Sequence, residues 1–464
     1  MKHYLGLHEL ELRRSDKEIP CYYEPTALIN GHMLWVGMSG TGKSFQSIRA
    51  LSSAVQAGVP CDIFDVHDEL DAVPGSQAVL YSQATGYGFN PLVLDQDPHT
   101  GGVARQAELL VGLIRDVAQI GPRQEAALRN LILDTYAISG IFADNRSTWR
   151  RAEVDEQTHK RLIEARRYEE LRRYFPTLAD LRDFARRKIL ALTIGVDNKN
   201  AQLFDNLQRV NKKLNSARSK YNKAHDDTEA QTIEAKVETI KRECLEAYQL
   251  YLDNLKTGRE TDDVLKYDSA ETLKSLIERI DLLNSSGIFR SNPPPFGDAL
   301  CRVHQIKSLT TEQQVLFVKL RLRNIFEEAK RRGPLRPGEG LRQIIFLDEA
   351  HKFVRKDPDD IINVIVREAR KFGVALWCAS QQPTDFPESF ATNVGATVIL
   401  GISSYYWPTA SRLLRITEEQ LKTVRPKQVI AAKFQREGEP DPSFVNIIVP
   451  SETSNGRRAR RRAA

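Results

Sequence analysis

The sequence predicts an α/β protein in which a mainly parallel sheet is interrupted by a long helical insertion. Three observations lead to this expectation. A short apolar strand passes through a glycine-rich loop into a helix at residues 33–55, and a second apolar strand, residues 343–347, ends in two carboxylates. Between them, from about residue 145 to residue 285, the chain becomes charged, helical and nearly free of strand patterns.

The glycine-rich loop, residues 37–44, fits the pattern G-x-x-x-x-G-K-[ST] with every required position filled. Such a loop presents the unpaired backbone N–H groups of a helix N-terminus to a triphosphate. We therefore expect ATP as the ligand, with Lys43 reaching the β- and γ-phosphates and the Ser44 hydroxyl taking one Mg²⁺ position. The residues expected to contact the nucleotide are Gly37, Ser39, Gly40, Thr41, Gly42, Lys43 and Ser44.

Composition restricts the class of protein. With 464 residues, 41% of them hydrophobic, the chain is long enough for one large α/β domain with an insertion. The five cysteines are scattered and no apolar run approaches the length of a membrane span, so we expect a cytoplasmic protein without a membrane partner. Much of the net charge of +6 lies in residues 451–464, which predict a disordered basic tail; weak attraction to a phosphate backbone is the alternative.

A buried strand followed by carboxylates occupies residues 61–69. Strand ends gather around the nucleotide crevice of a parallel sheet. Asp65 is therefore expected either to face the γ-phosphate and its water, in a catalytic role, or only to cap the following turn. For Asp68 and Glu69 we favour the capping interpretation. Ahead of the glycine-rich loop, residues 1–33 are a short lead-in, in which residues 19–25 predict an irregular or strand-like cover.

Helical patterns fill the middle of the chain. Apolar spacing predicts helices at residues 103–117 and 123–139, and an antiparallel coiled-coil hairpin inside residues 145–285 with its turn near residues 224–227. The Lys and Arg residues of this insertion predict a solvated face, with nucleic-acid binding or partner docking as alternatives. The predicted divisions are a first core segment, 1–144, the insertion, 145–285, a second core segment, 286–450, and the tail, 451–464.

The α/β alternation resumes after residue 292, and its second acid-bearing strand supplies the expected catalytic groups. Asp348 is expected to hold Mg²⁺ through water, and Glu349 to polarise the water that attacks the γ-phosphate. Gln381 is expected either to sense the γ-phosphate or orient the water, or only to form a turn. The predicted elements are strands at 302–309, 343–347, 374–379 and 397–402, helices at 311–330 and 360–372, and a closing hairpin of 428–434 with 444–449.

Five stretches, in order along the chain, resemble motifs of the HerA/FtsK superfamily of DNA-pumping ATPases, and HerA is the most similar branch. They are residues 63–69, 89–92, 347–353, 367–374 and 379–383. The resemblance covers residues 31–140 and 300–450. It implies a RecA-like P-loop ATPase core, a homohexameric ring that threads duplex DNA, and ATP hydrolysed between neighbouring subunits.

The resemblance also implies roles for individual residues. It assigns the nucleotide site to the loop and the acid pair, the sensor to Gln381, and the finger that reaches a neighbour's ATP to Arg370. A helix-face salt bridge is the alternative for Arg370, and Arg367 is the fallback finger. Relatives work with nucleases in end resection or with effector enzymes in antiphage defence. The β-barrel that precedes the loop in HerA proteins has no counterpart here, and the 145–285 insertion is unusual, so partner and pathway stay open.

Three functions follow from these patterns. The leading one is an ATP-driven DNA translocase with helicase-type activity. The second is a regulatory or scaffold ATPase whose ring organises an effector through the helical insertion, and the third is a secretion motor at a membrane, which the absence of a span disfavours. Residues 348–351 also spell a DEAH box, but 305 residues separate Asp348 from Lys43 and no second phosphate-pocket domain follows, which excludes the two-domain helicase class.

Overall fold

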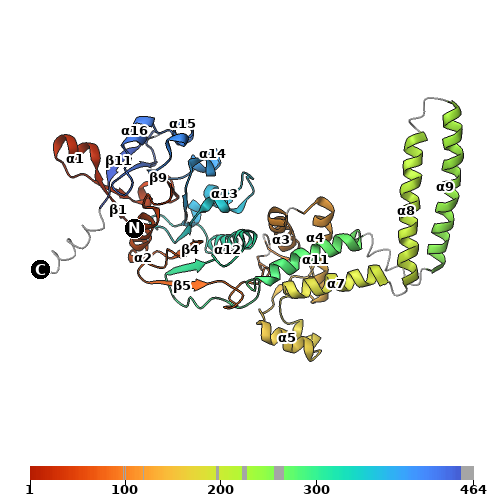
Figure 1. Ribbon diagram of the computed structural model, residues 1–464. Helices are drawn as coiled ribbons and strands as arrows, with labels where there is room; N and C mark the ends of the chain where they lie inside the picture. Colours follow the sequence, from red (N-terminus) through yellow and green to blue (C-terminus); the bar gives the residue numbers. More distant parts are fainter. Residues whose placement is uncertain are drawn as a thin grey trace. The chain divides into compact units, whose positions relative to one another are not determined.

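The computed structural model describes residues 1–97, 99, 101–118, 120–194, 198–221, 227–254, 266–440 and 442–450. The predicted basic tail and most of the predicted turn at residues 224–227 lie outside these ranges. The chain forms two compact units (Figure 1). One comprises residues 1–88, 286–288 and the described residues from 292 onward; the other comprises the described residues of 89–285 together with 289–291. The domain boundaries at residues 144 and 285 stay predictions.

The first unit is built on one sheet that has eleven strands within the described residues, in the order β2-β1-β11-β10-β9-β3-β8-β7-β4-β6-β5. The strands from β9 to β5 run parallel to one another, whereas β10, β11, β1 and β2 pair antiparallel. The α/β prediction with a mainly parallel sheet is therefore confirmed. The strands are β1 His3–His8, β2 Pro20–Tyr23, β3 Met33–Gly37, β4 Cys61–Asp65, β5 Ser76–Leu80, β6 Cys301–Gln305, β7 Gln343–Leu347, β8 Val374–Ser380, β9 Ala396–Gly401, β10 Val429–Phe434 and β11 Val445–Ile448.

Helices cover both faces of this sheet. Successive side chains of a strand point to opposite sides, so the apolar residues of a central strand need cover on both faces. On β4, Ile63 belongs to the same apolar core as Leu51 of α2 (Lys43–Gln56). The next residue, Phe64, lies edge-on to Phe317 of α12 (Thr311–Arg331), with 6.4 Å between ring centroids. The other helices of this unit are α1 Glu9–Ser15, α13 Ile361–Glu368, α14 Glu388–Ala391, α15 Trp407–Leu414 and α16 Glu418–Thr423, with 3₁₀ turns η1 Pro25–Ala27, η3 Ala350–Lys352, η4 Ala369–Phe372, η5 Pro383–Asp385 and η6 Ser404–Tyr406.

The N-terminal segment and β5 differ most from the sequence expectation. Residues 1–33 do not merely cover the core, because β1 pairs with β11 and extends the sheet by two strands. A Cβ atom on Gly6 of β1 would lie 2.1 Å from the Ile448 carbonyl oxygen, so this pairing requires glycine. Strand β5 was not predicted, since only one face of this edge strand is buried and its sequence is short and mixed.

The second unit is helical. Its helices α3 Val103–Ala118 and α4 Pro122–Ile138 agree with the helices predicted at 103–117 and 123–139. Leu128, Leu131 and Tyr136 of α4 are fully buried, and the Tyr136 hydroxyl donates to the Leu92 carbonyl oxygen at 2.8 Å. The other helices are α5 Glu156–Glu164, α6 Tyr168–Leu171, α7 Leu178–Ile194, α8 Asn198–Tyr221, α9 Asp227–Asn254 and α11 Ala270–Ser285, with η2 at Arg146–Trp149.

Helices α8 and α9 pack along their length in opposite directions. Leu207, early in α8, lies in an apolar cluster with Ala247, late in α9, whereas Ala217 and Val237 pack together near the other end of the pair. This arrangement confirms the predicted antiparallel pairing of the two helices. The two helices lie side by side (Figure 1), and both of these apolar clusters are formed by residues of α8 and α9.

A fully buried carboxylate, Asp62, organises a polar network inside the sheet of the first unit. Asp62 Oδ1 lies 3.0 Å from His304 Nε2, and Oδ2 accepts hydrogen bonds from Arg302 at 2.6 Å and from Gln343 Nε2 at 2.7 Å. The other ring nitrogen of His304 contacts the Tyr81 hydroxyl at 2.8 Å. Burial opposes ionisation of Asp62, but these partners outweigh it and hold the pKa of Asp62 well below its usual range.

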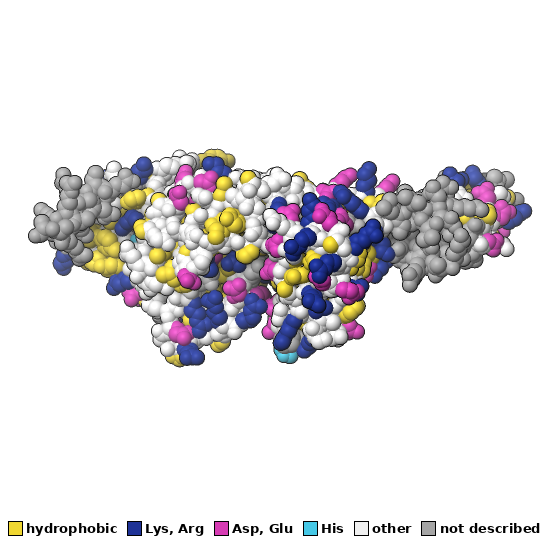
Figure 2. All heavy atoms as spheres, turned by 90° about the horizontal axis from the view of Figure 1, so that it is seen from below, with side chains coloured by type: hydrophobic (Ala, Val, Ile, Leu, Met, Phe, Trp, Pro, Cys, Tyr) yellow, Lys and Arg dark blue, Asp and Glu magenta, His cyan; other side chains and the backbone are white. Residues whose placement is uncertain are grey.

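The surface carries charges of both signs. In the face shown in Figure 2, Lys and Arg side chains lie intermixed with Asp and Glu side chains. Within the described helices, none is long and apolar enough to cross a membrane.

Replacing residues 198–254 by a flexible linker is expected to leave the rest of the chain folded. The apolar contacts of α8 and α9 are made chiefly within the pair, and loop-closure entropy grows slowly with length. The urea midpoint of unfolding, followed by circular dichroism, should match that of the parent protein. Aggregation of the shortened chain would show that the pair supports the core of the second unit.

Candidate nucleotide-binding site

The loop between β3 and α2 has the backbone geometry that its glycines allow. Gly40 and Gly42 have φ values of 77° and 99°, in the left-handed region where other residues are strained. A Cβ atom on Gly37 would lie 2.6 Å from Thr41 Oγ1, so this position also needs glycine. The Thr41 hydroxyl donates to the Met38 carbonyl oxygen at 2.7 Å and closes the loop, while Ser39 is exposed at its tip.

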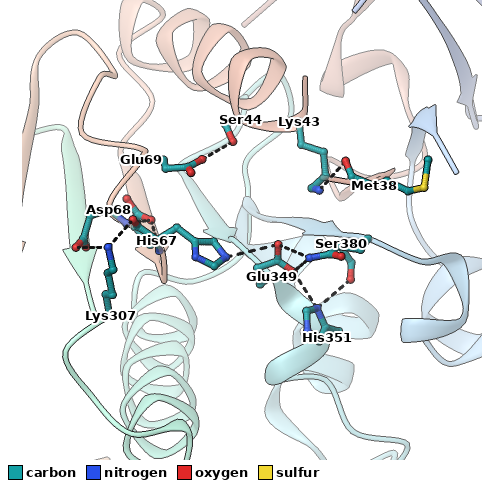
Figure 3. A network of polar contacts seen from close by, with 12 residues as sticks. Met38, Lys43, Ser44, His67, Asp68, Glu69, Lys307, Glu349, His351 and Ser380 are labelled. Atoms are coloured by element: carbon teal, nitrogen blue, oxygen red, sulfur yellow. Dashed lines mark hydrogen bonds and ion pairs between the residues drawn. The ribbon is translucent and has the colours of Figure 1, made fainter. Parts of the chain in front are cut away.

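Lys43 and Ser44 begin α2 and turn in different directions (Figure 3). Lys43 Nζ donates to the carbonyl oxygens of Gly37 at 2.6 Å and Met38 at 3.3 Å, so its ammonium group lies over the loop. The Ser44 hydroxyl donates to Glu69 Oε2 at 3.0 Å. Both predicted phosphate-site side chains therefore lie at the N-terminus of the helix.

The carboxyl ends of four parallel strands meet at the edge of the sheet that carries this loop. Val36 of β3 lies opposite Ser380 of β8, and Leu347 of β7 lies opposite Cys378 of β8 and Phe64 of β4. The residues at or directly after these strand ends are thereby gathered at one edge, as predicted for Asp65, Asp348, Glu349 and Gln381.

Asp348 is a crowded carboxylate. Burial, together with the nearby charges of Glu349, Asp65 and Glu69, raises the pKa of Asp348 to about 7, although Lys43 acts in the opposite direction. Within the described part of the chain, the Asp348 side chain has no hydrogen-bond or ion-pair partner. A carboxylate in this electrostatic setting is suited to a bound cation.

Glu349 lies in a network of polar side chains although it is nearly buried (Figure 3). Gln381 Nε2 lies 3.2 and 3.3 Å from its two carboxylate oxygens, and His351 Nδ1 lies 3.1 Å from Oε2. Burial alone would raise the pKa of Glu349, but the hydrogen bonds from His351 and Gln381 and the charge of Lys43 lower it to about 2. Glu349 also has a φ of 49°, a left-handed conformation that is costly for a side-chain residue.

Three further residues belong to this site and were not predicted as functional. His67 Nε2 lies 3.7 Å from Glu349 Oε1, on the other side of the carboxylate from His351. Glu69, for which turn capping was favoured, instead accepts the hydrogen bond of Ser44. The sequence did contain a signal for these residues, namely their positions after strand ends. His351 comes two residues after Glu349, and His67 and Glu69 follow the end of β4.

Asp65 has the contacts that the capping interpretation requires. Its carboxylate accepts hydrogen bonds from the backbone N–H groups of His67 at 3.0 Å, Asp68 at 2.9 Å and Leu70 at 2.8 Å. Burial raises the pKa of Asp65, and the three backbone bonds act against this. A catalytic role for Asp65 stays a prediction.

Arg370 lies away from the other predicted site residues. It is in η4, which precedes β8, whereas Gln381 follows β8, and seven residues of strand span about 20 Å. Its guanidinium donates to Glu437 Oε1 at 3.0 Å, and both side chains are exposed. Arg370 therefore forms a salt bridge, but with a residue of a loop and not along a helix face. The role of Arg370 as a finger stays a prediction. Arg367, the fallback, is exposed in the last turn of α13.

The side chains near the loop could hold Mg²⁺ only if a bound nucleotide supplied further oxygen ligands. No cluster of three or more His, Cys, Asp or Glu side chains able to hold a metal ion occurs in the described ranges. Magnesium usually keeps several water ligands and takes one or two protein groups plus phosphate oxygens. The Ser44 hydroxyl and the crowded Asp348 carboxylate fit that requirement.

The fold is similar to that of VirB4 of Thermoanaerobacter pseudethanolicus. The TM-score is 0.62 with 13% sequence identity, and the likeness covers 98% of this chain and 97% of that chain. The chain therefore shares the fold of this protein over nearly its whole length. The predicted RecA-like core and the predicted resemblance are confirmed at the level of the fold.

Other comparisons are weaker. The plasmid coupling protein TrwB in complex with a non-hydrolysable ATP analogue gives a TM-score of 0.46 at 11% identity, over 97% of this chain and 94% of that chain. B204, the DNA-packaging ATPase from Sulfolobus Turreted Icosahedral Virus, gives 0.24 at 17% identity, over 30% of this chain and 62% of that chain. These two scores are too low to support an argument. No protein-family model and no curated protein sequence matches the chain.

Removing the Asp65 carboxylate is expected to destabilise the first unit. Asp65→Ala leaves three backbone N–H groups without their acceptor and should lower the free energy of unfolding in urea by about 1–3 kcal/mol. Asp65→Asn keeps one side-chain oxygen and should lose less. Equal stability of Asp65→Ala and the parent protein would contradict the capping interpretation. Loss of ATP turnover in a stable Asp65→Asn protein would instead support the catalytic one.

Proposed function

We propose that the chain is an ATP-hydrolysing motor that moves duplex DNA as a homo-oligomeric ring. The observation that carries the proposal is Glu349, an ionised and nearly buried carboxylate that polar side chains hold at the strand edge beside the phosphate loop. A carboxylate so placed, with Lys43 across the same edge, is the arrangement that phosphoryl transfer to water requires.

The site residues have separate tasks in this chemistry. Lys43 exchanges its contacts with loop carbonyl oxygens for the β- and γ-phosphates of ATP. Glu349 accepts a hydrogen bond from the attacking water and aligns it. Because its pKa is about 2, it is ionised at neutral pH and acts by orientation and charge more than by complete proton removal. Gln381, already in contact with Glu349, orients the water or senses the γ-phosphate.

Ser44 and Asp348 are the residues that would hold Mg²⁺. When bound, the ion would supply positive charge that offsets the negative charge of the phosphate groups. Ser44 would then give up its hydrogen bond with Glu69 to face the ion. The positive charge of the ion would favour the ionised form of Asp348, whose pKa is otherwise raised.

Movement of duplex DNA rests on the family likeness. The five motifs occur in the order found in DNA-pumping ATPases, and the fold agrees with VirB4 over nearly the whole chain. A homohexameric ring and a nuclease or antiphage effector partner belong to the same proposal, as does helicase-type activity.

One observation favours the scaffold alternative. Helix α9 exposes Leu245, Tyr248 and Leu250, which are 67%, 50% and 51% exposed. Apolar side chains on the outside of the α8–α9 pair suit contact with a partner protein. In that case ATP would organise an effector complex without movement along DNA.

ATP turnover by the purified chain, with and without duplex DNA, tests the proposal. The parent protein should hydrolyse ATP, and duplex DNA should raise the rate. Glu349→Gln should bind ATP normally but turn over at least about 100-fold more slowly, because the amide keeps the shape without the charge. Lys43→Ala should lose nucleotide binding itself.

The outcomes separate the alternatives. Equal turnover in Glu349→Gln and the parent protein would remove Glu349 from the chemistry. ATP turnover that duplex DNA leaves unchanged would favour the scaffold function. The mass of the protein with ATP and duplex DNA reports whether a ring forms.

The role of Arg370 can be tested by mixing two inactive variants. An arginine finger supplied by a neighbouring subunit is worth about 10³–10⁵ in rate, so Arg370→Ala should bind ATP yet hydrolyse it poorly. Mixed with Lys43→Ala, it should regain activity, because an intact Lys43 site can then face an intact Arg370. If subunits exchange and the mixture stays inactive, the ion pair with Glu437 is the better account of Arg370.

A further inference from the structure

The position of Glu349 determines the direction in which a bound nucleotide runs. Glu349 follows β7, and the sheet order around the loop strand is β9-β3-β8-β7. The γ-phosphate must lie near Glu349, on the β8 and β7 side of the loop. The remainder of the nucleotide therefore extends toward the β9 side.

On the β9 side, two backbone segments pack against the phosphate loop. The Met38 N–H donates to the Gly401 carbonyl oxygen at the end of β9, at 2.9 Å. A tight turn, residues 425–428, packs against the same place, because a Cβ atom on Gly401 would lie 3.3 Å from both Pro426 and Thr41. The Lys427 N–H donates to the Thr41 carbonyl oxygen at 3.3 Å and joins the turn to the loop.

Lys427 has an anchored stem and a free ammonium group. A Cβ atom on Gly42 would lie 3.5 Å from Lys427 Cγ, so the stem passes the residue that caps α2. The side chain is exposed, and across the described residues its amine has no hydrogen-bond or ion-pair partner. Its φ is 63°, a left-handed conformation that favours glycine or asparagine and is strained for a lysine.

We propose that Lys427 is a nucleotide ligand, whose ammonium group binds the α- and β-phosphates from the same subunit. This inference rests on the proposed nucleotide site and adds a residue to it. Lys427 and the N-terminus of α2 both favour negative charge at the same place. Lys43 serves the γ-phosphate end, and Lys427 serves the end nearer the nucleoside. The strained backbone is explained because it directs the side chain across Gly42.

The decisive variant is Lys427→Gly, which removes the amine and relieves the backbone at once. Equilibrium binding of ADP, ATP and inorganic pyrophosphate should weaken by about tenfold for each ligand, the size of one charge-assisted hydrogen bond. The urea midpoint should stay the same or rise, so a loss of binding is not a loss of folding. Lys427→Arg should keep most of the affinity. Lys422→Ala, an exposed lysine of α16, is the matched control for one lost charge and should bind as the parent does.

Each outcome decides the assignment. Unchanged binding of all three ligands by Lys427→Gly would overturn the proposal. Weaker binding of ATP alone would place the amine on the γ-phosphate, and weaker ADP binding with unchanged pyrophosphate binding would place it on the nucleoside; both would overturn the assignment to the α- and β-phosphates. Lys43→Ala, measured in parallel, tests the nucleotide site itself: if it binds normally, the proposed function fails irrespective of Lys427.

Discussion

In a parallel sheet the carboxyl ends of all strands lie along one edge, and β3 has β8 on one side and β9 on the other. This pairing places the phosphate loop between two sets of groups. On the β8 side are the acids after β7 and the amide after β8; on the β9 side are Gly401 and the turn that carries Lys427. A register shift of β3 against either neighbour would separate the loop from one of these sets, so the order and register of three strands determine the site.

Two adjacent carboxylates at this edge differ widely in proton affinity. Asp348 has a pKa of about 7 because burial and three neighbouring acids disfavour its charge. Glu349 has a pKa of about 2 because His351, Gln381 and Lys43 outweigh its burial. Such a pair of environments separates the tasks of the two acids. In the proposed function a cation would stabilise the charge of Asp348, whereas Glu349 would need no cation and would face the attacking water.

The phosphate loop and the acid pair were predictable because local patterns specify them: a glycine spacing in one case, and an apolar strand that ends in acids in the other. The antiparallel α8–α9 pair followed from apolar periodicity. His67, Glu69 and the proposed ligand Lys427 were not predictable as site residues, because their positions depend on which strand ends become neighbours. Likewise β1 and β5 join the sheet through β11 and β6, which lie hundreds of residues away in the sequence.

The pairing pattern also has a consequence for biosynthesis. Among the described residues, β3 pairs only with β8 and β9, β4 only with β6 and β7, and β5 only with β6. None of these three strands finds a partner until the ribosome has passed residue 301, which takes on the order of ten seconds or more after β5 is made. The helices of the second unit emerge in that interval, and they pack against one another. Any fragment that ends between β5 and β6 therefore carries three strands with unpaired edges, two of them apolar, which makes this region a poor place to truncate the chain.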